Sequence, residues 1–218
     1  MARRVTGERF LHIHRQGPLI NPHAPLAPGA TLEIGTTINP FYGFFLNHTR
    51  VYGYENLDGS QFEATPVQFI KWRRDGLIDV PEQRFSEVAF ESVRHFVFLA
   101  REIIMEDVRR EIAPDAPSRQ RCMWATSEDM RPYWSERLDG VMASIEVDGI
   151  VHKADASFLL GDSEPLSVTY ERARCYWRGD SGERPQWEYL IEGTVRVLAV
   201  EECKGTNSPS AARIENSV

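Results

Sequence analysis

The chain has 218 residues, 42% of them hydrophobic and 26% charged, so it falls in the ordinary globular range and can bury its own core without disulfide or metal staples. Its formal net charge of −7 argues against sequence-independent binding of nucleic acid over the whole surface, which needs many phosphates neutralised by Lys or Arg. The three cysteines lack zinc spacing and no run reaches the roughly 18 apolar residues of a membrane helix, so we expect a cytoplasmic protein with neither a metal site nor a membrane partner.

The sequence of the N-terminal third of the chain predicts two short strands and one irregular segment. Residues 9–15 (RFLHIHR) predict a first strand, and residues 31–34 predict a second strand after a loop rich in Pro and Gly. The stretch 36–79 contains many aromatic residues and glycines but no sustained period. It therefore predicts a packed, irregular segment.

A long amphipathic helix follows. Apolar residues recur at helical spacing from residue 89 to residue 108, and Ser86 is placed as the N-cap. The pattern predicts a helix over about 84–112 that ends before Pro114.

Strand patterns dominate the second half of the chain. Residues 121–127 predict a strand, and residues 140–159 predict a β-hairpin whose tight turn is Asp148-Gly149, a dipeptide favoured in two-residue turns. Residues 187–202 predict a last strand or strand pair, on the alternation of Val195, Val197 and Ala199.

One short helix is predicted over about 166–178, with Gly179 as its stop signal. Strands and helices without regular βαβ alternation predict an α+β fold with mostly antiparallel pairing. We expect a single domain over residues 1–203, followed by a disordered polar tail over 204–218.

Three separated segments carry residues suited to chemistry: LHIHR at 11–15, MWATSEDMRPYW at 123–134 and WEYLIEGTVRV at 187–197. In order and separation they resemble the motifs of the ADP-ribosyltransferase fold, in its poly(ADP-ribose) polymerase and diphtheria-toxin-like branch and in small bacterial proteins grouped with it. The resemblance implies a mostly antiparallel split sheet, with NAD⁺ as co-substrate and no metal.

The resemblance also implies site residues. The first motif, His-Gly-Ser/Thr-Arg, is matched in turn by His12, Ile13, His14 and Arg15. The second, a Tyr-Phe-Ala strand followed by a Ser-containing turn and an aromatic-ended helix, is matched by Trp124, Ala125, Ser127 and Tyr133. The third, an Asn-Glu-Tyr-Ile-Val-Tyr strand, places Glu188 on the catalytic glutamate, and Glu192 is the nearest alternative on the same strand.

These residue types suit the cleavage of the bond between nicotinamide and ribose. That reaction develops an oxocarbenium-like cation, which an ionised Glu188 would stabilise while accepting a hydrogen bond from the ribose. The resemblance implies that His12 contacts the adenosine ribose and that Tyr133 or Trp124 stacks on nicotinamide. The pyrophosphate would be met by charge-assisted hydrogen bonds from Arg15, Arg119 or Arg121.

The resulting functional hypothesis is a mono-ADP-ribosyltransferase that modifies a macromolecular acceptor, either protein or nucleic acid. By analogy of fold, such a small enzyme would be the toxin of a bacterial toxin–antitoxin or anti-phage defence system, with an antitoxin or immunity protein as partner. The 36–79 stretch would select the acceptor, and the basic segment Lys71–Arg74 with Trp72 would contact a nucleic-acid acceptor.

Two alternatives remain open. The first is a catalytically silent module of the same fold that binds an ADP-ribose-like ligand or a partner protein. The second is a metal-dependent hydrolase, because His12 and His14 point to the same face of a strand and could begin a metal site.

Overall fold

A computed structural model describes residues 1–14, 26–55, 59–138, 140–159 and 162–203. Arg15 and the predicted tail over 204–218 lie outside these residues. The fold is mixed α and β, and the described part of the chain forms an antiparallel sheet and five α-helices. Among the helices of this part, none is long and apolar enough to cross a membrane.

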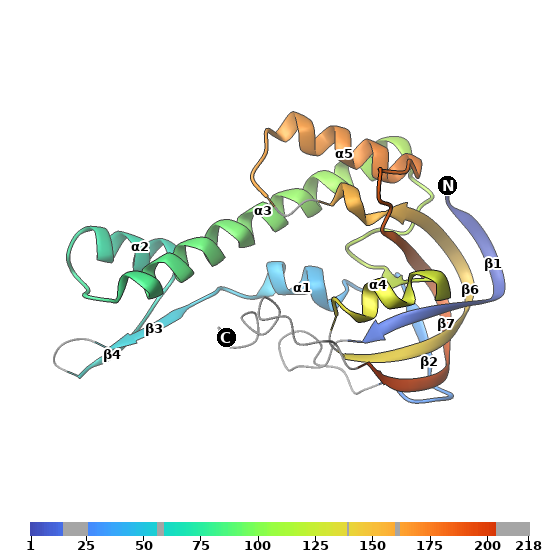
Figure 1. Cartoon of the computed structure of the whole chain (residues 1–218), viewed down its shortest axis with the longest axis horizontal. Helices are drawn as coiled ribbons and strands as arrows, with labels where there is room; N and C mark the ends of the chain where they lie inside the picture. Colours follow the sequence, from blue (N-terminus) through green and yellow to red (C-terminus); the bar gives the residue numbers. More distant parts are fainter. Residues whose placement is uncertain (15–25, 56–58, 139, 160–161, 204–218) are drawn as a thin grey trace.

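The main sheet curls strongly (Figure 1). Its strand order is β1 (Arg3–His14), β6 (Gly140–Asp155), β7 (Trp187–Cys203) and β2 (Thr31–Ile34), and β5 (Met123–Ala125) also pairs with β7. All of these pairs are antiparallel. Backbone hydrogen bonds of 2.8 and 2.7 Å between Leu11 and Thr126 bring the end of β1 beside β5, so the strands with the three motifs are neighbours.

Apolar clusters cover both faces of the sheet. One face packs Phe10, Ile145, Ile191 and other side chains of the sheet against one another. The opposite face packs against α3 (Glu82–Ile112) and α5 (Leu166–Arg178). Because side chains alternate along a strand, neighbouring residues of β5 and β7 contribute to different clusters, as Leu190 and Ile191 do.

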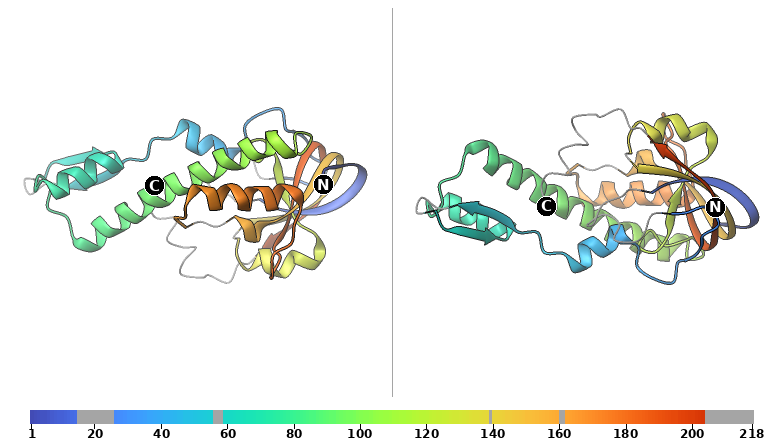
Figure 2. Two further views of the ribbon diagram at one scale, coloured as in Figure 1. Left: turned by 90° about the horizontal axis from the view of Figure 1, so that it is seen from above. Right: turned by 90° about the horizontal axis from the view of Figure 1, so that it is seen from below.

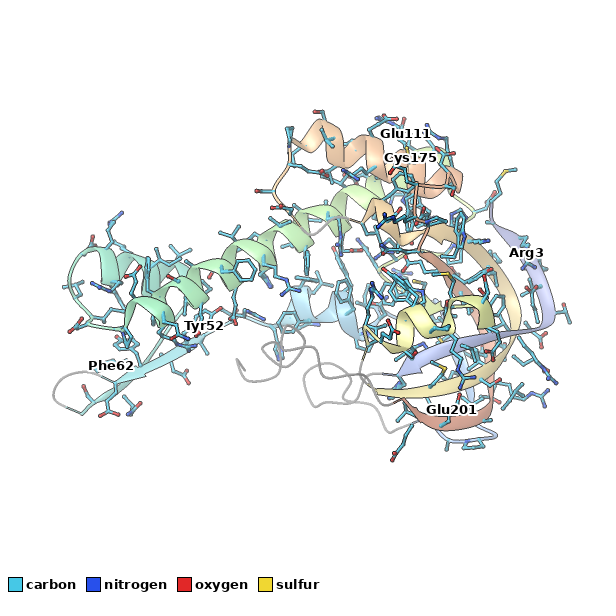
Figure 3. All side chains as sticks on the ribbon, viewed as in Figure 1. Arg3, Tyr52, Phe62, Glu111, Cys175 and Glu201 are labelled. Carbon is cyan, nitrogen blue, oxygen red and sulfur yellow. The ribbon has the colours of Figure 1, made fainter. Side chains whose placement is uncertain are left out.

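The N-terminal half of α3 extends beyond α5 and away from the sheet, as both views of Figure 2 show. Beside it lie α2 (Pro66–Arg74) and the hairpin of β3 (Tyr52–Glu55) and β4 (Gln61–Ala64), which together form an arm. The arm has an apolar cluster of its own, which includes Tyr52 (Figure 3). A further helix, α1 (Pro40–Asn47), connects the arm to the sheet, and α4 (Arg131–Ser135) follows β5.

Four predicted elements are confirmed with nearly the expected bounds. The last strand, predicted over 187–202, is β7. The strand predicted over 31–34 is β2, and the helix predicted over about 166–178 is α5, which Gly179 ends in the left-handed conformation with φ of 75°. The long helix is α3, although it begins at Glu82 after Pro81 and not at the predicted cap, Ser86.

The prediction of an irregular segment over 36–79 is wrong. This stretch contains α1, α2 and the β3–β4 hairpin, each of only 4 to 9 residues. Local caps define the two helices: the Asn39 side chain accepts a hydrogen bond from the Tyr42 backbone N–H, and Thr65 and Gln68 form a capping box. Elements this short show too few turns or alternations for a period to be visible.

The predicted hairpin with a turn at Asp148-Gly149 is also wrong, because β6 continues unbroken through both residues. Gly149 lies opposite Gly193 of β7, and a Cβ on Gly149 would lie 2.1 Å from the Glu192 backbone oxygen. The Asp148 carboxylate accepts a hydrogen bond from the Gly7 backbone N–H at an irregularity of β1. This Asp-Gly pair therefore permits a close approach of strands and does not make a turn.

Candidate functional site

Glu188 lies near the start of β7 on the face that packs against α3 and α5. Leu190, two residues further along, belongs to the apolar cluster on this face. The intervening Tyr189 faces the other way and contacts the ring of Phe10, with 4.9 Å between centroids. Only 8% of Glu188 is exposed, so its carboxylate depends on protein partners.

Two groups donate to one oxygen of this carboxylate and form a closed triangle with it. Glu188 Oε1 accepts a 2.7 Å hydrogen bond from Arg119 Nη1 and a 2.5 Å hydrogen bond from the Tyr176 hydroxyl. The Tyr176 hydroxyl in turn accepts a 2.7 Å hydrogen bond from Arg119 Nη1. The other carboxylate oxygen, Oε2, takes no part in these hydrogen bonds, and no described residue donates to it.

Arg119 is held from its other side by a second buried carboxylate. Its Nε donates to Glu102 Oε2 at 3.0 Å, and Glu102 also accepts a hydrogen bond of 2.8 Å from Arg101. The Arg119 guanidinium lies over the Trp124 ring at 5.4 Å and over the Tyr176 ring at 5.2 Å. Arg119 is therefore enclosed by other side chains, and only 4% of the residue is exposed to solvent.

The charges of this cluster determine the protonation of its members. Burial alone would raise the pKa of Glu102, but Arg119 and Arg101 outweigh burial and hold that pKa below its usual value. Burial alone would lower the pKa of Arg119, but Glu102, Tyr176 and Glu188 keep it well above its usual value. Burial and the Glu188 charge raise the pKa of Tyr176, so its hydroxyl stays protonated and acts as a fixed donor.

Trp124 lies beside this cluster on the same face of the sheet. Its ring packs against the cluster of α3 and α5 and meets the Phe41 ring edge to face, with 5.6 Å between centroids. The indole Nε1 is buried and has no hydrogen-bond partner among the described residues. The site thus combines a fixed carboxylate with a partly buried aromatic ring.

His12 and His14 lie on the opposite face from Glu188. They alternate with Leu11 and Ile13 along β1 and share the face of Phe10, and their rings are 6.0 Å apart. The expectation that His12 and Glu188 contact the same NAD⁺ molecule therefore needs correction, because the Glu188 side chain points to the opposite face of the sheet.

His12 nevertheless contacts the backbone of the site. Burial lowers the pKa of His12 to about 4, so its imidazole is neutral at pH 7. A carbonyl oxygen only accepts hydrogen bonds, so the 2.7 Å contact makes His12 Nδ1 a donor to the Trp124 carbonyl. The imidazole therefore supports the strand that carries Trp124.

The structure separates several of the other predicted residues. Ala125 packs in the apolar cluster on the His12 face. Ser127 precedes a 3₁₀ turn, and Tyr133 lies on α4, where its ring is covered by the Arg137 guanidinium at 3.7 Å. Arg119 is also corrected: its hydrogen bonds to Glu102, Tyr176 and Glu188 leave it unsuited to hold a pyrophosphate.

Glu192 belongs to a different place on β7. Its side chain packs over Gly35, in a polar pocket of about 440 Å³ at the end of α3 that Arg110 and Arg121 also line. No contact joins Glu192 to the triangle around Glu188 among the described residues.

Sequence reasoning did not find Glu102 or Tyr176. Both lie on helices that were predicted, on the faces that pack against the sheet. A charge or a hydroxyl within an apolar helical stripe is the signal that could have found them, because such a group needs a buried partner.

No group of three His, Cys, Asp or Glu side chains suited to a metal ion occurs within the described part of the chain. The pair His12 and His14 thus gains no third ligand there.

Comparison with known proteins places the chain in one family. A family model described as "Protein of unknown function (DUF2441)" matches residues 10–204, which include every residue of the cluster around Glu188. No curated protein matches the chain. The chain belongs to the DUF2441 family.

Proposed function

We propose that the protein is a mono-ADP-ribosyltransferase that transfers ADP-ribose from NAD⁺ to a macromolecular acceptor, with Glu188 as the catalytic carboxylate. The observation that carries the proposal is the asymmetry of this carboxylate: Oε1 is fixed by Arg119 and Tyr176, whereas Oε2 receives no hydrogen bond from a described residue. Oε2 is then the oxygen that accepts from the ribose of NAD⁺. A carboxylate fixed in advance stabilises the developing oxocarbenium ion without reorganisation.

Trp124 supplies the second part of the proposed site. It shares a face of the sheet with Glu188, and Arg119 contacts both side chains. Nicotinamide is a flat aromatic ring, for which an indole is a suitable stacking partner. Nicotinamide against Trp124 would place the adjoining ribose toward Glu188.

The arrangement of strands supports an ADP-ribosyltransferase-like fold as part of the proposal. The strands with the three motifs, β1, β5 and β7, are neighbours in that order through the Leu11–Thr126 bridge and the β5–β7 pairing. The proposal differs from the sequence hypothesis in the roles of two residues. Arg119 holds the Glu188 carboxylate and does not bind the pyrophosphate. His12 acts through its hydrogen bond to the Trp124 carbonyl and does not contact the sugar.

The test is release of nicotinamide from labelled NAD⁺ in a cell lysate. Wild-type protein should release nicotinamide and leave label on an acceptor, and protease or nuclease treatment then shows whether that acceptor is protein or nucleic acid. Glu188→Gln should abolish release because the amide cannot balance positive charge on the ribose. Glu192→Gln is the matched control, since it makes the same change on the same strand outside the cluster, and it should retain activity.

Two results would contradict the proposal. Wild-type protein that releases no nicotinamide with protein, RNA and DNA acceptors supplied would favour the catalytically silent binding module. Activity that survives in Glu188→Gln but not in Glu192→Gln would move the reaction to the pocket at the end of α3. If the enzyme is a toxin, Glu188→Gln should also relieve toxicity on expression, and an antitoxin or immunity protein would be its partner.

A further inference from the structure

We infer that Tyr176 is a positioning residue for Glu188, which fixes the carboxylate through its hydroxyl while Oε2 stays free for the substrate. The inference rests on the proposed function and adds to it a residue that none of the three sequence motifs contains. It follows from the closed triangle of Glu188, Arg119 and Tyr176.

The ring of Tyr176 has little freedom to move. The residue is 0% exposed, and its ring meets the Trp177 ring edge to face with 5.0 Å between centroids. Trp177 is anchored in turn, because its indole Nε1 donates a 2.7 Å hydrogen bond to the Met105 carbonyl of α3. The packing of α5 on α3 therefore determines where the hydroxyl lies.

The hydroxyl restricts the carboxylate in a way that Arg119 alone does not. With one donor on Oε1, the carboxylate can rotate about the bond to that donor, whereas two donors from different directions define its plane. The two donors come from different elements, Tyr176 from α5 and Arg119 from the loop before β5. Loss of the hydroxyl should thus disturb orientation without removing the charge.

The chain offers a matched pair of variants on one helix. Tyr176→Phe removes the hydroxyl and keeps the ring, and Tyr170→Phe makes the same change at a partly buried tyrosine of α5 that packs against the same apolar cluster. Tyr176→Phe should lower kcat for NAD⁺ cleavage about tenfold, the effect of one charge-assisted hydrogen bond, and change KM by less than about twofold. Tyr170→Phe should leave both constants unchanged.

A second measurement does not depend on turnover. With ¹³C-labelled glutamate, the side-chain carboxyl resonance of Glu188 is identified by its absence in Glu188→Gln. This resonance should move in Tyr176→Phe and stay in place in Tyr170→Phe. Circular dichroism checks the fold, and Arg119→Lys replaces Tyr176→Phe if that variant is unfolded, because lysine keeps the charge but cannot reproduce the guanidinium fork.

The outcomes separate the inference from the proposed function. An unchanged kcat in folded Tyr176→Phe overturns the inference, and so does an effect on KM alone. If the wild type does not cleave NAD⁺, the proposed function fails, and the resonance then decides whether Tyr176 holds Glu188. A resonance that does not move would overturn the inference in that case.

Discussion

His152 makes a quantitative prediction about acid stability. The side chain lies on β6, is 0% exposed and packs against the Trp177 ring with 5.3 Å between centroids. Neither ring nitrogen makes a hydrogen bond of normal geometry with a described residue, although the nearby Tyr176 backbone favours the protonated form. Burial, together with the nearby N-terminal ammonium group, lowers the pKa of His152 to about 4 from an ordinary value of 6.5.

The size of the effect follows from this pKa difference. Between pH 6.5 and about pH 4 the unfolded chain binds a proton at His152 that the folded chain does not bind, so stability falls as the pH falls through this window. At 1.36 kcal/mol for each pKa unit, the loss attributable to His152 is about 3 kcal/mol. His152→Leu removes the titrating group, so the variant should lose about 3 kcal/mol less than wild type over the same window.

Urea denaturation at a series of pH values measures this difference directly, since the midpoint and slope give the free energy of unfolding at each pH. At pH 7 the variant should be at least as stable as wild type, because two buried nitrogens without partners have been removed. His48→Leu makes the same substitution at an exposed histidine and is the matched control. Parallel curves for His152→Leu and wild type would refute the reasoning.

Two further substitutions test the packing of the sheet and the site. Arg119→Met should lower the free energy of unfolding by about 3–5 kcal/mol at pH 7, because Glu102 stays buried without its main counter-charge, and acidification should recover part of this loss. Urea denaturation of the variant at pH 7 and about pH 5 measures the size of this loss and the sign of its pH dependence. A loss of stability below about 1 kcal/mol at pH 7 would contradict burial of the ion pair. Gly149→Ala should cost about 3 kcal/mol in thermal or urea unfolding, because the new Cβ would meet the Glu192 backbone oxygen. Gly53→Ala, where the nearest atom is 4.0 Å away, should cost far less, and equal costs would rule out the close approach.

The sequence was sufficient wherever one element has a strong period of its own. The helix α3 shows its apolar stripe over many turns, and α5 combines a stripe with Gly179 as a terminal signal. The short elements between residues 36 and 79 were missed because each contains only a turn or two. The prediction of a turn at Asp148-Gly149 was wrong because an Asp-Gly dipeptide occurs both in tight turns and where two strands approach closely.

The candidate site divides in the same way. Local pattern alone identified the strands of Glu188, Trp124 and His12, since strand patterns are local properties of the chain. Only the tertiary structure decided that Glu188 and His12 face opposite ways, because this depends on how β1, β5 and β7 align across the sheet. Only the tertiary structure brought Tyr176 and Arg119 to the carboxylate, because they come from a helix and a loop that lie outside the sheet and reach β7 only through side-chain hydrogen bonds. The sequence determined which charged residues lie on elements that pack in the core. The packing of α3 and α5 on the sheet decided which of these residues contact one another. This matters because a buried charge is tolerated only where a residue of opposite charge is buried beside it.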